Sequence, residues 1–357
     1  MSFSAKDGGM SIISDHDITL VPANAITGPL LGMLHARLQA CDDCAVANVR
    51  AGLGGPFGAS LHVYDGSELI DVAGPVGNAV LSTGLASAHA EDRVMVPENV
   101  EKLRAVLARV GAGASVYVVS SAESCPACHA KLEILARSLV GDGLLGAGRF
   151  HVLYGATYDD TREVAGFHDA PYHTDMTKAP GERLIAVGHC ALNDCPASFR
   201  VALEQGHAVI ASHDGYHFVG HDARGDDVIA TAEISAIRNA CRAEQASGSS
   251  TPWDLEQGVL YSPAQAVGPL MYAEAQWANI SRIVLTLQSK VQEAADIGND
   301  DFFHIVAARP YNGAGAAAQI IRLSPFENKA QHEWARQRAE DPEATRQYNG
   351  LSISGSV

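Results

Sequence analysis

The chain has 357 residues, 47% of them hydrophobic and 18% charged, and its formal net charge is −16. This length corresponds to about two domains, and the composition excludes disorder on a large scale. The negative charge argues against a nucleic-acid partner, because binding a phosphate backbone requires clustered Lys and Arg. The sequence has no apolar run typical of a signal peptide or a membrane span, so we expect a cytoplasmic protein with no membrane partner.

The first part of the chain alternates between helical and strand-like patterns. Apolar residues recur at helical spacing and then at strand spacing, and an Asp-Gly pair marks a β-hairpin turn. This order predicts an α/β fold with a mixed sheet and helices on both faces. In chain order we expect a helix at 30–49, a strand before Asp65-Gly66, a strand at 69–73, a helix opened by 88–92, a strand at 115–120 and a helix opened by 125–128.

The same order of elements recurs further along, which indicates an internal repeat. The second copy has its own hairpin turn and opens its helices at matching positions. The matched pairs are Asp65-Gly66 with Asp214-Gly215, His89 with Thr231, Glu91 with Glu233, Cys125 with Gly268 and Cys128 with Met271. Strands of the second copy are expected at 216–220 and 259–262. The predicted division is an N-terminal leader at 1–29, a catalytic domain at 30–178, a second copy at 179–310 and a C-terminal extension at 311–357.

The C-terminal extension contains a charged stretch, 329–341, that favours a helix and ends before Pro342. We expect a solvated helix there, with packing at an interface as the second possibility.

One group of residues carries the chemistry of a catalytic metal site. His89, Cys125 and Cys128 supply three zinc ligands, which leaves a fourth position for water, and Glu91 supplies a nearby carboxylate. Zinc lowers the pKa of a bound water toward ~7, and a carboxylate beside it can carry protons. His-x-Glu followed by Cys-x-x-Cys is typical of zinc nucleobase deaminases, although Ser124 stands here where the common pattern has proline.

Simpler interpretations of these residues exist. A lone Cys-x-x-Cys is often a pair of core thiols, and two Cys and one His can form a closed structural site with a fourth ligand such as His129. The presence of Glu91, which a structural site does not need, favours the catalytic interpretation. A second pair, Cys41 and Cys44, lies inside the 30–49 helix without a His-Ala-Glu motif, and we expect core thiols there.

The first copy resembles the cytidine-deaminase superfamily and, within it, bacterial guanine deaminases. The resemblance covers 54–175 and rests on five motifs: Gly55-Pro56-Phe57-Gly58-Ala59, Gly77-Asn78-Ala79-Val80, Ala88-His89-Ala90-Glu91, Glu123-Ser124-Cys125-Pro126-Ala127-Cys128, and Ala165-Gly166-Phe167-His168-Asp169. It implies two tandem three-layer α/β/α domains with mixed sheets that form a pseudo-dimer within the chain.

The resemblance also implies the roles of the site residues. Asn78 would hydrogen-bond the base, with Phe57 and Ala90 lining its pocket, and Asp169 would bind the N–H edge of guanine. His168 replaces the first Asp of the family's Gly-Phe-Asp-Asp element. The implied reaction is hydrolysis of guanine to xanthine and ammonia, with attack by a zinc-bound hydroxide, Glu91 as the proton shuttle and one Zn²⁺ per chain.

The second copy has Thr231, Gly268 and Met271 at the ligand positions, so it is expected to hold no zinc and to be catalytically inactive. Two roles are open for it. In the first, residues 300–304 cover the mouth of the first copy's site. In the second, this copy only buries a face that it shares with the first copy. Further homodimerisation of the chain also stays open.

Other functions fit the motifs less well. A cytosine, cytidine or other nucleoside deaminase shares the metal residues, because these residues do not select the base. A tRNA-editing deaminase shares them too, but the net charge of −16 counts against it. A non-catalytic zinc protein belongs to a different class and would have no use for Glu91. A small-molecule nucleobase is therefore the expected partner.

Overall fold

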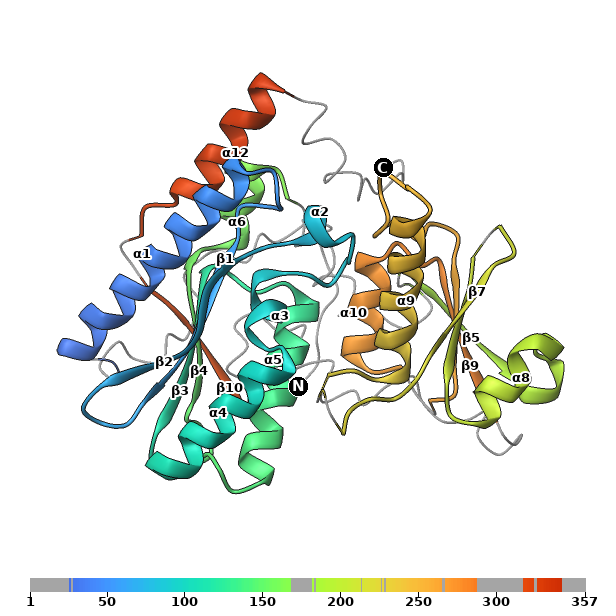
Figure 1. Ribbon diagram of the computed structural model, residues 1–357, viewed down its shortest axis with the longest axis horizontal. Coiled ribbons are helices and arrows are strands. Elements are labelled where there is room, and N and C mark those ends of the chain that lie inside the picture. Colours follow the sequence, from blue (N-terminus) through green and yellow to red (C-terminus); the bar gives the residue numbers. More distant parts are fainter. Residues whose placement is uncertain are drawn as a thin grey trace, which may run out of the picture.

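Two five-stranded sheets lie side by side in the computed structural model, with helices between them and on their outer faces (Figure 1). The structure describes residues 26, 28–167, 182, 184–212, 214–225, 227, 229–264, 267–287, 317–323 and 326–341. Within these residues, no helix is both long and apolar enough to cross a membrane.

The first sheet has the strand order β10-β4-β3-β1-β2. Strand β1 is antiparallel to both β2 and β3, whereas β3, β4 and β10 run parallel. The strands are β1 (Gly58–Tyr64), β2 (Leu69–Gly77), β3 (Ser115–Ala122), β4 (Phe150–Ala156) and β10 (Ala318–Arg322).

Helices cover both faces of the first sheet. Strand side chains alternate between the two faces, so Val116 and Val118 of β3 pack in one core while Tyr117 and Val119 pack in another. The helices of this half are α1 (Pro29–Arg50), α2 (Val80–Thr83), α3 (Ala90–Val94), α4 (Pro97–Val110), α5 (Pro126–Gly141), α6 (Tyr158–Asp160), the π-helical turn η3 (Thr161–Ala165) and α12 (Lys329–Glu340). Helix α1 lies on the Tyr117 face and buries Leu34, Leu38 and Cys41, which are spaced three or four residues apart.

The second sheet repeats the arrangement of the first, with the strand order β5-β9-β8-β6-β7. Strand β6 is antiparallel to β7 and β8, whereas β8, β9 and β5 run parallel. The elements are β5 (Ala186–Ala191), the 3-10 turn η5 (Leu192–Asp194), α8 (Ala197–Glu204), β6 (Ala208–Ala211), β7 (His217–Gly220), α9 (Ala232–Ala246), β8 (Val259–Ser262), α10 (Pro269–Trp277) and β9 (Arg282–Leu287).

The two sheets exchange their fifth strands. Strand β5 follows the first sheet's β4 in sequence but pairs with β9 of the second sheet. Conversely, β10 follows β9 in sequence but pairs with β4 of the first sheet. Below, the first half means the first sheet with its helices, including β10 and α12, and the second half means the second sheet with its helices.

The halves meet through helices that lie between the sheets. Helix α5 of the first half packs on α10 of the second, and α9 lies beside α10 (Figure 1). One hydrophobic cluster runs across this contact and contains Cys128 and Ala130 from α5 as well as Leu270 and Tyr272 from α10. The cluster makes the inner faces of both halves one continuous core.

The α/β class and the mixed sheets predicted from the sequence are confirmed, and the expected helix at 30–49 is α1. Of the two expected core thiols, Cys41 is fully buried, whereas Cys44 is only half-buried at the surface of α1. Of the two possibilities for the C-terminal stretch, interface packing is found. Helix α12 packs on α1 and buries Ala330, Gln331 and Trp334, while most of its charged side chains face solvent. The reason is that Asp42 of α1, itself fully buried, accepts hydrogen bonds from the backbone N–H groups of Lys329 and Ala330 and so anchors the start of α12.

Candidate metal centre and active site

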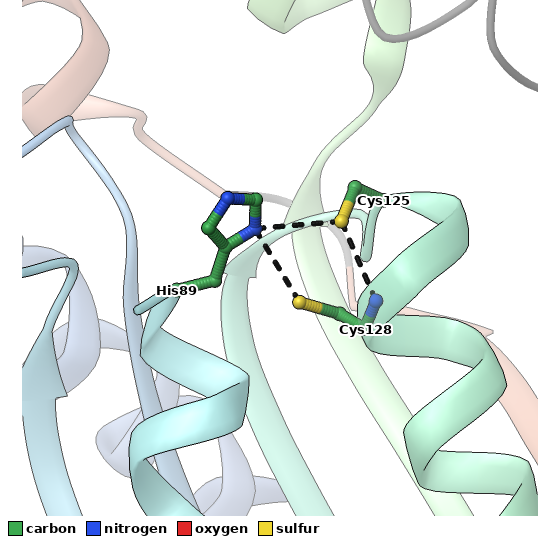
Figure 2. Close-up of side chains that lie close together, drawn as sticks. All are labelled: His89, Cys125 and Cys128. Carbon is green, nitrogen blue, oxygen red and sulfur yellow. Dashed lines mark hydrogen bonds between the residues drawn. The ribbon is translucent and has the colours of Figure 1, made fainter. Parts of the chain in front are cut away.

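His89 and Cys125 occupy equivalent positions in two helices. Each is the residue that immediately precedes the first turn, His89 before α3 and Cys125 before α5, and each has an extended backbone. Strand β3 leads to Cys125, and Cys128 follows in the first turn of α5. The backbone N–H of Cys128 donates to the Cys125 sulfur at 3.4 Å, so the helix N-terminus favours negative charge there. Figure 2 shows the three side chains facing one another.

The three side chains form a compact set of metal donors. The Nδ1 atom of His89 lies 3.4 Å from the Cys125 sulfur and 3.4 Å from the Cys128 sulfur (Figure 2). With Zn–N of about 2.05 Å and Zn–S of about 2.3 Å, a tetrahedral zinc places its nitrogen and sulfur ligands about 3.5 Å apart. The observed spacing fits that geometry, and all three residues are buried. Within the part of the chain that the structure describes, this is the group that can hold a metal ion, and His129 does not belong to it.

The three residues influence one another's protonation in the metal-free protein. Burial opposes charge on the His89 imidazole, but the Cys125 thiolate outweighs burial and raises the pKa of His89 to about 9. Burial also opposes a Cys125 thiolate, yet donation from Cys128 and the charge of His89 hold the pKa of Cys125 well below its ordinary value. Burial and the neighbouring Cys125 raise the pKa of Cys128. Negative charge on the Cys125 sulfur and positive charge on the His89 ring thus favour each other, and metal binding requires the donors to give up their remaining protons.

Glu91 lies two residues beyond His89, inside the first turn of α3, and is 5% exposed. The hydroxyl of Ser120, at the end of β3, donates to Glu91 Oε1 at 2.8 Å. Burial, followed by the charge of Cys125, raises the pKa of Glu91. The site thus combines a metal-donor set with a buried carboxylate that is oriented through one of its two oxygens.

The other predicted site residues lie in the same half. Asn78 is fully buried, and its Oδ1 accepts from the backbone N–H groups of Gly55 and Val80, which ties it to the loop before β1. Ala90 is fully buried at the start of α3. Phe57 packs edge-on against Phe167, with ring centroids 5.0 Å apart. Asp169 and His168 lie outside the described residues.

The positions of the second half that the sequence matched to the metal donors keep the backbone setting without the donors. Thr231 precedes α9 and Gly268 precedes α10, as His89 and Cys125 precede their helices. The carboxylate arrangement persists, because the hydroxyl of Ser262 donates to Glu233 Oε1 at 2.5 Å. The segment 300–304, expected to cover the site, lies outside the described residues.

Sequence reasoning missed two aromatic residues near the site. Trp277, the last residue of α10, packs against the His89 ring with centroids 4.7 Å apart. Trp334 of α12 packs against Phe167 at 5.6 Å. Neither belongs to a motif. The tryptophan at position 334 in an otherwise charged stretch is a signal in the sequence that points to a docked face.

Comparisons with known proteins give partial structural similarities. A guanine deaminase from Bacillus subtilis is 28% identical over 42% of this chain and 81% of its own, with a TM-score of 0.30. NE0047, solved in complex with 2,6-diaminopurine, is 24% identical over 43% of this chain and 72% of its own, with a TM-score of 0.27. A mutant of NE0047 in complex with 8-azaguanine is 23% identical over 40% of this chain and 75% of its own, with a TM-score of 0.27. No family model and no curated protein matches the sequence.

Proposed function

We propose that the chain is a zinc-dependent hydrolytic deaminase of a free nucleobase, with guanine as the favoured substrate. The observation that carries this proposal is the convergence of His89, Cys125 and Cys128 at zinc-like spacing beside the buried, serine-anchored Glu91. A structural metal site needs the donors but not the carboxylate. The combination is that of a hydrolytic site.

Each residue of the centre has a distinct role in this proposal. His89 Nδ1 and the two cysteine sulfurs would hold one Zn²⁺, which when bound supplies the activation of water that catalytic zinc provides. Glu91 takes one proton from the attacking water and gives it to the ring nitrogen, and then takes the second proton from the oxygen added to the ring carbon and gives it to the departing amine. Ser120 holds Oε1, so Oε2 is the oxygen that carries the proton.

The preference for guanine rests on the motifs and their places in the fold. The Oδ1 atom of Asn78 accepts from the backbone N–H groups of Gly55 and Val80, which fixes the side chain that would contact the base. Phe57 and Ala90 would line the pocket, and Asp169 would accept from the N–H edge of guanine. The products are then xanthine and ammonia.

The second half is proposed to be a degenerate deaminase-like domain, paired with the first in an intrachain pseudo-dimer. The equal strand orders of the two sheets and the matching helix starts support this. Because Thr231, Gly268 and Met271 offer no donor set, we assign one zinc to each chain.

Two measurements test the proposal. The purified chain is assayed for zinc content, and for ammonia release from guanine, adenine, cytosine and their nucleosides. We expect one zinc per chain and the highest rate with guanine. A zinc-loaded protein that releases ammonia from none of these compounds would refute the proposal, and a preference for another base or a nucleoside would correct its substrate.

Variants separate the shuttle from the ligands. Glu91→Gln should abolish turnover and keep the zinc, whereas loss of zinc would show that Glu91 is a ligand. Glu233→Gln is the matched control, since Glu233 makes the same serine contact in the second half. This control should leave activity unchanged.

A further inference from the structure

A residue of the second half touches a metal donor of the first. Trp277 ends α10 and is 6% exposed, and its indole ring meets the imidazole of His89 with centroids 4.7 Å apart and planes inclined by 85°. This is the edge-to-face geometry that aromatic pairs prefer. The contact joins residues that are far apart in the sequence and lie in different halves.

The outer nitrogen of His89 makes this contact informative. Nδ1 faces the two sulfurs, so Nε2 is the nitrogen that points away from the metal position (Figure 2). In metal sites this second nitrogen normally donates to a carboxylate or a carbonyl, which fixes the orientation of the ring. Among the described residues no group bonds to Nε2, although the atom is buried. The ring is therefore oriented by packing, and Trp277 is the aromatic side chain that packs on it.

Trp277 is itself held firmly against the first half. Glu274, one turn earlier on α10, forms an ion pair with Lys131 of α5 at 2.5 Å, and both side chains are 1% exposed. Lys131 lies one turn beyond Cys128 and also binds Asp92, the neighbour of Glu91, at 2.7 Å. The same ion-pair network therefore connects α10 to both ligand-bearing helices, α3 and α5.

We infer that Trp277 is a positioning residue for the metal site, and that the second half orients His89 through this aromatic contact in place of the usual hydrogen bond. The inference rests on the proposed function only in taking His89, Cys125 and Cys128 as metal donors. It assigns the second half a role at the site itself.

The test measures zinc affinity, without substrate, by competition with a chromogenic chelator. Trp277→Leu should weaken zinc binding by about 10- to 100-fold, the range found when groups that orient metal ligands are removed. Trp277→Phe keeps an aromatic edge and should restore affinity to within about threefold of the parent. Trp253→Leu is the control, since Trp253 is an equally buried tryptophan of the second half. Trp253→Leu should leave zinc affinity unchanged.

A second measurement covers the case in which Trp277→Leu does not fold. The chain has three tryptophans, so replacing Trp253 and Trp334 with phenylalanine leaves Trp277 as the single emitter. Its fluorescence should change when zinc is added to the metal-free protein.

The outcomes distinguish this inference from the proposed function. Parent-like zinc affinity in Trp277→Leu, or no fluorescence response of Trp277 to zinc, overturns the positioning role whatever the activity. Zinc binding that weakens in Trp277→Leu, in a protein that deaminates nothing, supports the positioning role and refutes the deaminase.

Discussion

Replacing Lys131 with methionine tests how strongly the two halves depend on their shared ion pairs. Lys131 is almost fully buried and bridges Asp92 at 2.7 Å and Glu274 at 2.5 Å. Burial alone would lower the pKa of Lys131, but the two carboxylates outweigh it and raise the pKa, so the ammonium stays charged at neutral pH. Methionine keeps the volume of the side chain and removes only the charge.

The expected loss in the free energy of unfolding depends on which cation each carboxylate keeps when Lys131 is replaced. Asp92 keeps a second cation, because Arg238 lies 3.4 Å from it, whereas Glu274 is 1% exposed and loses its close ion-pair partner. Breaking a buried pair in this way typically costs about 3–5 kcal/mol. Removing both charges, in Lys131→Met with Glu274→Leu, should recover at least ~2 kcal/mol of that loss, since no uncompensated charge is left inside.

Urea denaturation at pH 7, followed by circular dichroism, measures these differences in the free energy of unfolding. Arg104→Met is the control, because Arg104 pairs with Asp142 at the surface, where side-chain exposures are 33% and 48%, and should cost less than ~1 kcal/mol. If Lys131→Met costs no more than Arg104→Met, or if the double variant loses the sum of its single losses, the pair does not hold the halves together as argued.

Three further predictions concern the site and its support. Ser120→Ala removes the hydrogen bond to Glu91. We expect kcat to fall about 10-fold and the zinc content to stay unchanged, because one hydrogen bond to a charged group is lost. Loss of zinc in this variant would contradict the reasoning. Burial, and then Arg149, lowers the pKa of His151 to about 4 from an ordinary value near 6.5. The unfolded chain therefore binds the proton first as pH falls, so stability should drop between pH 6.5 and 4, and His151→Phe should show a shallower drop in urea midpoints. Trp334→Ala should lower the free energy of unfolding by about 3–5 kcal/mol, because the ring is 2% exposed. It should also raise KM, because Trp334 contacts Phe167. An unchanged KM would show that α12 does not support the pocket for the base.

The sequence was most informative where local patterns decide structure. The spacing of Leu34, Leu38 and Cys41 marks the buried face of α1, and the observed helix extends the expected range by one residue at each end. The three residues that could hold a metal were brought out by the sequence because each belongs to a short motif that starts a helix. His89 and Cys125 are indeed the residues that precede α3 and α5.

What the sequence did not predict depends on packing between distant segments. Nothing local to Trp277 indicates that it meets His89, because the contact requires α10 to lie on α5. One usable signal was present: Lys131 and Glu274 follow Cys128 and Met271 by one turn and carry opposite charges at matching repeat positions. Opposite charges at equivalent positions of two copies suggest that the copies face each other, although the pattern alone does not show that both side chains are buried.

The exchange of strands β5 and β10 also affects the order in which the two sheets can form while the chain is being synthesised. Strand β10 comes from residues 318–322 of a 357-residue chain, yet it completes the sheet that begins with β1 at residue 58. During synthesis, one edge of β4 therefore stays unpaired until the second sheet and β10 have been made. During that interval the unpaired edge can bind other nascent chains, and pairing over such a long sequence separation is slow. The architecture thus predicts that the N-terminal half completes its sheet only after the second half has been synthesised, and that chaperone supply affects its yield.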